Sequence, residues 1–349
     1  MQIPIENIYY LLCYAWNSLE EKGRVSVSID DKTTLLDLFA KVLINGIKQL
    51  LKRGIDRNYV SETAEISGVK GKLELAQTLK SNLLLQQKTI CTFDEFSANI
   101  LPNQILVSTI LRLLKTQNLD NVLKHELRNL QRRFVEIEPI ELHHAIFKNV
   151  NFHRNSLIYN FLMNVCEIIY DSTLPAEQES KFTFSDFTRD DARMNRLFEN
   201  FVRNFYAIEQ KEFSIVKREN IEWNFKNVSE ESLKYLPQMQ TDITLENEEQ
   251  KIIIDAKFYR ETMTLHYDKE KIKSANLYQL FSYLLNQESD GFKTALKTKS
   301  ATGILLYPTI EEEYDLQFAY HEHNIYIRTV NLNAHWRDIA ARLQKIISF

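Results

Sequence analysis

The chain has 349 residues, enough for two domains of ordinary size, and 44% of them are hydrophobic while 26% are charged. This balance is typical of a globular protein and excludes a disordered chain. The formal net charge of −4 is small, and its acidic excess lies after residue 150, so bulk charge does not favour tight binding to a polyanion. No apolar run is long enough to cross a bilayer and no signal peptide is evident, so we expect a cytoplasmic protein without a membrane partner.

The cysteine and glycine positions exclude further classes of protein. The 3 cysteines lie far apart without metal-type spacing, so we expect reduced core residues. None of the 7 glycines falls in a GxxxxGK[ST] or GxGxxG pattern, so the chain has no recognisable phosphate-binding loop. If the function uses a nucleotide, a partner is expected to bind it.

The first part of the chain reads as helices around a short β region. Apolar periodicity predicts helices over residues 5–19 and 35–51, the second ending near Gly54. Residues 59–75 favour β structure with a turn at 68–72, where Lys70 and Lys72 make a small, exposed, basic tip. Two helices are predicted within residues 99–134. We expect a boundary near residue 150, with domains 1–150 and 151–349, and a helix at 157–170 that fits either side.

The second part alternates helices with strands, which predicts an α+β domain with a mixed sheet flanked by helices. The expected helices are 191–208, which has Glu199 beside its apolar stripe, and 274–286. The expected strands are 221–225, 241–245, 251–257 and 303–308.

The strands at 241–245 and 251–257 carry the strongest candidate site. A turn near 248–249 would fold them into a hairpin and bring Asp242 opposite Asp255. Side chains alternate along a strand, so Asp255 and Lys257 share a face. Two carboxylates and an ammonium then converge, which suits a hard divalent cation and hydrolysis of a phosphodiester. A strand that ends in Asp with Lys two residues later is also common as plain structure, but a charge after a buried run is costly unless it is paired or coordinated.

The order of these elements resembles the PD-(D/E)xK nuclease fold, although Gln238 follows Pro237 where the motif's name has an acid. The resemblance is sharper to the McrC family, the nuclease subunits of McrBC modified-cytosine restriction systems, and it covers nearly the whole chain. The matching segments are 3–10, 14–16, 68–73, 93–94, 103–105, 236–237, 241–244, 255–259, 276–280 and 306–308.

The resemblance implies roles for individual residues. Asp242 and Asp255 would bind Mg²⁺ with the Ala256 carbonyl as a third ligand, and Lys257 would position water or stabilise the phosphate. Gln279 would support the lysine or the water. The alternative is that it is only a polar residue at the edge of the apolar stripe of its helix. Glu199 would be an additional acid of the site, or is a solvated helix residue.

The resemblance also implies a division of labour. Domain 1–150 would bind and stimulate a hexameric AAA+ GTPase ring of the McrB type, with GTP bound by that partner. The exposed basic turn makes Lys70 and Lys72 candidates for the interface, unless it is an ordinary surface hairpin. Domain 151–349 would cut double-stranded DNA that contains modified cytosine, as the endonuclease subunit of a type IV restriction system. Two other functions stay open at this point: a stand-alone metal-dependent nuclease, and a non-catalytic activator of an AAA+ partner.

Overall fold

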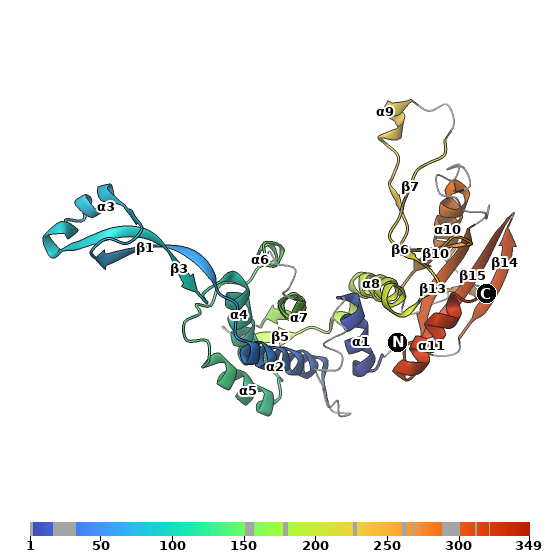
Figure 1. Ribbon diagram of the computed structural model, residues 1–349. Helices are drawn as coiled ribbons and strands as arrows, with labels where there is room; N and C mark the ends of the chain where they lie inside the picture. Colours follow the sequence, from blue (N-terminus) through green and yellow to red (C-terminus); the bar gives the residue numbers. More distant parts are fainter. Residues whose placement is uncertain are drawn as a thin grey trace. The chain divides into compact units, whose positions relative to one another are not determined.

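The computed structural model forms two compact units, which we call the sheet unit (Met1–Lys32 with Asp186–Phe349) and the helical unit (Thr33–Ser185) (Figure 1). This division differs from the boundary expected near residue 150, both because the N-terminal helix belongs to the sheet unit and because the helix after residue 156 belongs to the helical unit. The structure describes residues 3–16, 33–150, 157–176, 181–225, 229–259, 264–266, 269–271, 273–287, 301–310, 313–320 and 322–349.

The helical unit is built around α2 (Leu35–Arg53), α4 (Leu101–Lys115) and α7 (Leu157–Ser172), with α7 packed against both of the others. Gly46 of α2 permits this contact, because a Cβ there would lie 2.5 Å from Leu162 of α7. A capping box between Thr34 and Asp37 starts α2, and Gly54 ends it at φ 92°. The other elements are α5 (Asn121–Gln131), α6 (His144–Lys148), β4 (Thr173–Pro175) and β5 (Phe182–Phe184).

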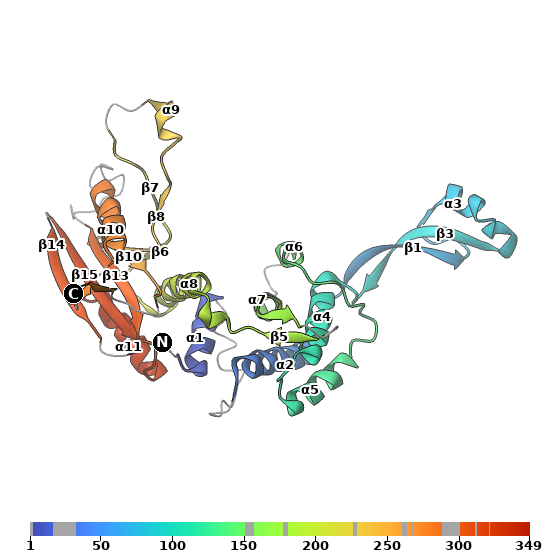
Figure 2. The same cartoon turned by 180° about the vertical axis from the view of Figure 1, so that it is seen from behind.

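A three-stranded sheet projects from these helices, and we call residues 58–97 the arm (Figure 2). Its order is β1 (Asn58–Ser67), β3 (Lys88–Ser97), β2 (Lys72–Leu73), so both outer strands pair antiparallel with β3. The turn at 68–72 is therefore not the tip of a two-stranded hairpin but a crossing over β3. Gly71 adopts φ 68° there, and a Cβ would lie 2.4 Å from the Thr92 carbonyl oxygen. The arm also contains α3 (Leu75–Lys80) and the 3₁₀ turn η2 (Leu83–Gln86).

Asn103 fastens the base of the arm to the helices. Its buried side-chain amide donates to the carbonyl oxygens of Asp56, before β1, and of Ala98, after β3, at 2.9 and 2.8 Å. Its own oxygen accepts from the Tyr159 hydroxyl of α7 at 2.7 Å, and that hydroxyl accepts from the Asp56 amide at 2.9 Å. The two ends of the arm are therefore held at one hydrogen-bonded point.

The sheet unit is centred on a six-stranded mixed sheet of order β14-β15-β13-β10-β9-β6. Strands β10, β13 and β15 are parallel neighbours, and β14, β9 and β6 pair antiparallel. This confirms the predicted mixed α/β fold class. The strands are β6 (Ile215–Lys217), β9 (Ile243–Glu246), β10 (Lys251–Ala256), β13 (Thr302–Thr309), β14 (Asp315–Tyr320) and β15 (His323–Asn331).

Helices cover this sheet, and two of them, α8 and α10, were predicted from their apolar periodicity. The stripe of α10 (Ser274–Gln287) packs on β10 and β13, where a Cβ at Gly303 would lie 2.8 Å from Leu284. Helix α8 (Asp191–Glu209) packs on β6, β9 and β10, and α11 (Trp336–Ile346) packs on β15. The expected strand at 221–225 is shorter, since β7 is Asn220–Ile221 paired with β8 (Met239–Gln240). Short elements complete the unit: η3 (Phe187–Arg189), α9 (Glu230–Leu233), β11 (Thr264–His266) and β12 (Lys269–Lys271).

The N-terminal helix α1 (Ile5–Ala15) is part of the sheet unit although it is distant in sequence. The buried Asn7 amide donates to the carbonyl oxygens of Leu332 and Ala334, at 2.8 and 2.9 Å, just before α11. Tyr10 stacks on Trp336 with ring centroids 4.6 Å apart. The predicted helix over 5–19 ends at Ala15, and residues 17–19 lie outside the described residues.

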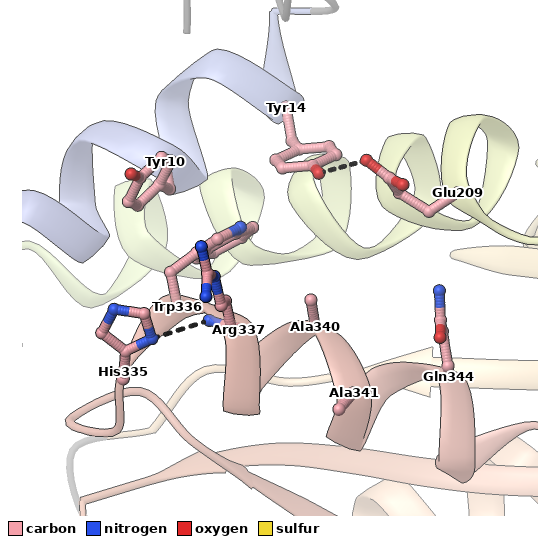
Figure 3. A pocket seen from close by; sticks show the side chains of 9 residues that line it. All are labelled: Tyr10, Tyr14, Glu209, His335, Trp336, Arg337, Ala340, Ala341 and Gln344. Atoms are coloured by element: carbon pink, nitrogen blue, oxygen red, sulfur yellow. Dashed lines mark hydrogen bonds between the residues drawn. The ribbon is translucent and has the colours of Figure 1, made fainter. Parts of the chain in front are cut away.

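A pocket of about 680 Å³ lies where α1, the end of α8 and α11 meet (Figure 3). The Tyr14 hydroxyl donates to Glu209 at 2.5 Å on its wall, and none of the predicted site residues lines it. Within the described ranges, no helix has both the length and the apolar character that a bilayer crossing needs.

Candidate functional site

The hairpin that carries the predicted acids has the expected register. Strands β9 and β10 pair antiparallel with Ile254 opposite Ile243. Across the turn, the Asn247 backbone N–H donates to the Gln250 carbonyl oxygen at 3.1 Å. Asp242 immediately precedes β9 and Asp255 follows Ile254, so the two acids stand one step beyond this pair. The consecutive isoleucines of β10 are buried on both faces of the sheet, as expected of a central strand that helices cover on both sides.

Asp242, Asp255 and Lys257 come together at the end of this hairpin. The Lys257 ammonium lies 3.0 Å from Asp255 Oδ1 and 3.3 Å from Asp242 Oδ2. The backbone N–H of Ala256 also donates to Asp242 Oδ2, at 3.1 Å. Lys257 is tied to the next strand through its own N–H, which donates to the Leu306 carbonyl at 3.0 Å. The three charged side chains are therefore held by paired strands.

Asp255 is the most constrained of the three. Its side chain is fully buried, and neither carboxylate oxygen has a hydrogen bond of good geometry among the described residues, the Lys257 ammonium being its near cation. Burial raises the pKa of Asp255 to about 7, against the lowering effect of Lys257. Burial alone would lower the pKa of Lys257, but Asp255 and Asp242 outweigh it and raise that pKa above its usual range. Lys257 therefore stays an ammonium ion while it is paired with both acids.

Glu199 of α8 faces this group and is not a solvated helix residue. It is buried, its Oε2 lies 3.0 Å from the Arg218 guanidinium, and its Oε1 accepts from the Asn195 amide. Burial raises the pKa of Glu199, and the nearby charge of Asp242 raises it further. Glu199 therefore lies within electrostatic reach of the hairpin acids, although its carboxylate is engaged by other partners.

Among the described residues, Gln279 makes no hydrogen bond to the hairpin acids or to Lys257. It is exposed on α10, and its amide donates to the Tyr283 hydroxyl at 2.7 Å. That hydroxyl in turn donates to the Gln240 carbonyl at 2.8 Å, two residues before Asp242. Gln279 is therefore placed to act through Tyr283 on the backbone that carries Asp242.

Two residues that the sequence reasoning did not select also organise the site. The Asn195 side-chain oxygen accepts from the Phe258 amide at 2.8 Å, so Asn195 joins α8 to the chain just after Lys257. Arg218 lies between β6 and β7 and pairs with Glu199. Asn195 precedes Glu199 by one helical turn, a spacing that could have drawn attention to it. No comparable sequence signal marks Arg218.

The donor set fits a hard cation. Within the described ranges, no three His, Cys, Asp or Glu side chains form a ready-made metal cluster. The Lys257 ammonium already lies against both hairpin acids, and in the described part of the chain Asp255 Oδ2 is buried with no hydrogen-bond donor. Carboxylate oxygens left in this way suit a small oxygen-seeking cation.

Comparison with known proteins shows the family of the chain. Residues 6–308 match the family described as McrBC 5-methylcytosine restriction system component, and the chain belongs to this family, as its sequence motifs predicted. It is 32% identical over 344 residues to the Escherichia coli K12 protein named "Type IV methyl-directed restriction enzyme EcoKMcrBC", covering 99% of this chain and 97% of that protein.

A solved structure shares the fold. The structure from Thermococcus gammatolerans, described as a half-complex of McrB AAA+ hexamers with bound McrC, matches with a TM-score of 0.53 at 18% identity. The match covers 99% of this chain and 76% of the other. The chain therefore shares its overall fold with a chain of that assembly.

We predict that Asp255→Asn leaves the metal-free protein at least as stable as the wild type. The substitution removes a fully buried charge whose burial is costly, and Lys257 keeps Asp242 as its partner. The measurement is chemical denaturation in the presence of a chelator. Asp37→Asn is the matched control, because this buried carboxylate accepts from Thr34 and Asp120, and its loss should cost about 1–3 kcal/mol. Equal destabilisation by the two substitutions would show that the Asp255 carboxylate stabilises the metal-free protein, contrary to this prediction.

Proposed function

We propose that this chain is the DNA-cleaving subunit of a modification-dependent, type IV restriction system. It hydrolyses a phosphodiester bond with Mg²⁺ at Asp242, Asp255 and Lys257. One observation carries the proposal: in a member of the McrBC family, a fully buried carboxylate whose near charged donor is Lys257 stands beside a second acid that shares this lysine. Strongly perturbed groups gathered in this way are characteristic of catalytic centres.

In this proposal Asp242 and Asp255 hold the metal ion, with the Ala256 carbonyl as a further ligand. A bound Mg²⁺ would supply Lewis-acid stabilisation of the phosphate and a more acidic water. The contribution of Lys257 follows from its charge. Because the two acids keep it protonated, it serves as a hydrogen-bond donor to phosphate oxygen and not as a proton acceptor.

The remaining residues position this group. Asn195 and Glu199 hold α8 against the chain beyond Lys257, and Gln279 acts through Tyr283 on the strand before Asp242. Glu199 adds negative charge next to the metal ligands, which increases the attraction for a cation. Gln279 is a positioning residue in this account.

We further propose that the chain works with a hexameric AAA+ GTPase ring of the McrB type, which binds GTP and recognises modified cytosine in double-stranded DNA. The sequence supports this because no phosphate-binding loop is present. The arm supports it because large apolar side chains are exposed on it, a property typical of protein-binding surfaces. They include Tyr59, Val69, Leu73, Leu75, Leu79, Leu84, Leu85 and Phe96.

Lys70 and Lys72 contribute to this surface in different ways. The Lys70 ammonium lies 3.9 Å from the centre of the Phe93 ring, and Lys72 pairs with Glu74 at 2.9 Å. Lys72 is 77% exposed at its side chain, so its charge remains accessible to a partner. The arm would thus present a mixed apolar and basic surface to the ring, held in place at Asn103.

We predict that Asp242→Asn and Lys257→Ala reduce DNA cleavage by at least a hundredfold. Each removes a metal ligand or the cation beside the phosphate, and loss of one such electrostatic contact typically costs about 10²–10³ in rate. Both variants should still stimulate the GTPase of the partner, since neither touches the arm. Cleavage of methylated plasmid and GTP turnover are measured on the same complexes.

The control for these variants is Asp338→Asn, an exposed acid of α11 that should leave cleavage unchanged. Cleavage near the wild-type rate by Asp242→Asn would refute the site. Loss of GTPase stimulation together with cleavage would instead indicate that the partner contact lies in the sheet unit.

We predict that the double variant Lys70→Glu/Lys72→Glu stimulates the partner GTPase less well. Either the maximal stimulation falls at least tenfold, or the concentration of this chain needed for half of it rises at least tenfold. The reversal removes the basic part of the arm surface and places like charge beside Glu74. GTP turnover is followed while the chain is titrated into the ring. Lys124→Glu/Arg128→Glu on α5, outside the arm, is the matched charge reversal and should change little. Equal effects of the two reversals would remove the arm lysines from the interface.

A further inference from the structure

Two arginines lie beside the carboxylates without a role in the chemistry described above. Arg218 pairs with Glu199 at 3.0 Å, yet 38% of its side chain remains exposed. Arg203 lies one helical turn after Glu199 on α8. Arg203 lies within electrostatic reach of Glu199 and Arg218, so the two cations come from a helix and from the segment between β6 and β7.

Arg203 is incompletely neutralised. One guanidinium nitrogen donates to the Asn200 side chain at 2.7 Å, while Nη1 is buried and has no hydrogen-bond partner among the described residues. Burial lowers the pKa of Arg203, and the positive charge of Arg218 lowers it further, against Glu199 and Asp242. Two cations are therefore held near one another although Glu199 bonds directly to only one of them.

The acidic and basic side chains around the hairpin acids are equal in number. With all six side chains ionised, Glu199, Asp242 and Asp255 would balance Lys257, Arg203 and Arg218, so the group has no negative excess. Addition of a divalent cation would leave a positive excess. A phosphodiester is an anion that would offset this excess, and a planar guanidinium matches the oxygens of a phosphate with two parallel donors.

A purely structural ion pair is the competing explanation. It accounts for Arg218 and Glu199, which together would fix the segment after β6 to α8. It does not account for the unpartnered Arg203 Nη1, because a buried donor without an acceptor destabilises the folded chain unless a ligand completes it.

We propose that Arg203 and Arg218 form a binding subsite for a backbone phosphate of the DNA strand, next to the phosphate that is cut. In the absence of DNA, Glu199 neutralises Arg218, and on binding Arg218 exchanges this carboxylate for phosphate oxygens while Arg203 completes its own hydrogen bonding. The subsite rests on the proposed nuclease function, to which it adds the residues that set the register of the strand.

The test is binding of the full-length chain to a short labelled duplex in Ca²⁺, by fluorescence anisotropy over a series of salt concentrations. Each lost phosphate contact should reduce the slope of log K against log[salt] by about 0.9. Arg203→Met and Arg218→Met should each show this reduction with roughly tenfold weaker binding, and the double variant about twice the change in slope. Arg337→Met removes the same charge from an exposed site on α11 and should leave the slope unchanged.

Two further variants separate the loss of a phosphate contact from a loss of folding stability. Because Arg218→Met leaves Glu199 without its cation, Arg218→Met/Glu199→Gln should restore the melting temperature but not the slope. If Arg203→Met does not fold, Arg203→Lys should keep the slope yet raise KM for DNA in the complex, since an ammonium lacks the paired donors. A wild-type slope for the folded double arginine variant, or a wild-type KM for Arg203→Lys, would overturn the subsite. If Asp242→Asn still abolished cleavage, the nuclease function would stand without it.

Discussion

The desolvated carboxylate of Asp255 is the constraint on which the rest of the site depends. It stands at the end of a strand whose residues are all buried, and its position cannot shift without moving the isoleucines of β10 from the core. A charge in such a place is unfavourable unless cations compensate it. Lys257 provides one cation, and a metal ion would provide another. The sheet thus holds the Asp255 carboxylate where its charge lowers the stability of the fold but favours the binding of a cation.

The surrounding residues hold the two ends of the hairpin at fixed distances from this carboxylate. Tyr283 bonds the backbone before Asp242, and Asn195 bonds the backbone after Lys257. These contacts come from helices on different parts of the sheet, so the geometry of the acids depends on the packing of α8 and α10. Helix α1 extends this support, because its Asn7 and Tyr10 contacts fix the start of α11. The N-terminal segment therefore contributes to the unit that carries the acids.

The sequence predicted those parts of the fold that depend on local pattern. The buried apolar run of β10 and the polar turn at 247–250 predicted the β9–β10 hairpin that the structure contains. The apolar stripes predicted helices α8 and α10. The ordered motifs gave the family, which the comparisons confirm.

Long-range packing accounts for what the sequence did not predict. The return of α1 to the sheet rests on hydrogen bonds between residues more than 300 positions apart. Placement of β3 between β1 and β2 depends on Gly71 passing over Thr92, which no turn rule contains. Arg218 lies in an irregular segment, where periodicity carries no information. The predicted role of Gln279 in supporting the lysine or the water stays a prediction, and its side-chain amide donates to the Tyr283 hydroxyl.

The central claim is that this chain carries the cutting site while a GTPase ring delivers the DNA. The small net charge of −4 supports this division, since such a chain gains little from counterion release on DNA. The most direct measurement is cleavage of a methylated plasmid in Mg²⁺ under three conditions: the chain alone, the chain with the partner and GTP, and the chain with the partner and a non-hydrolysable GTP analogue. The account predicts efficient cleavage in the second condition alone. Efficient cleavage by the isolated chain would contradict it and establish a stand-alone nuclease.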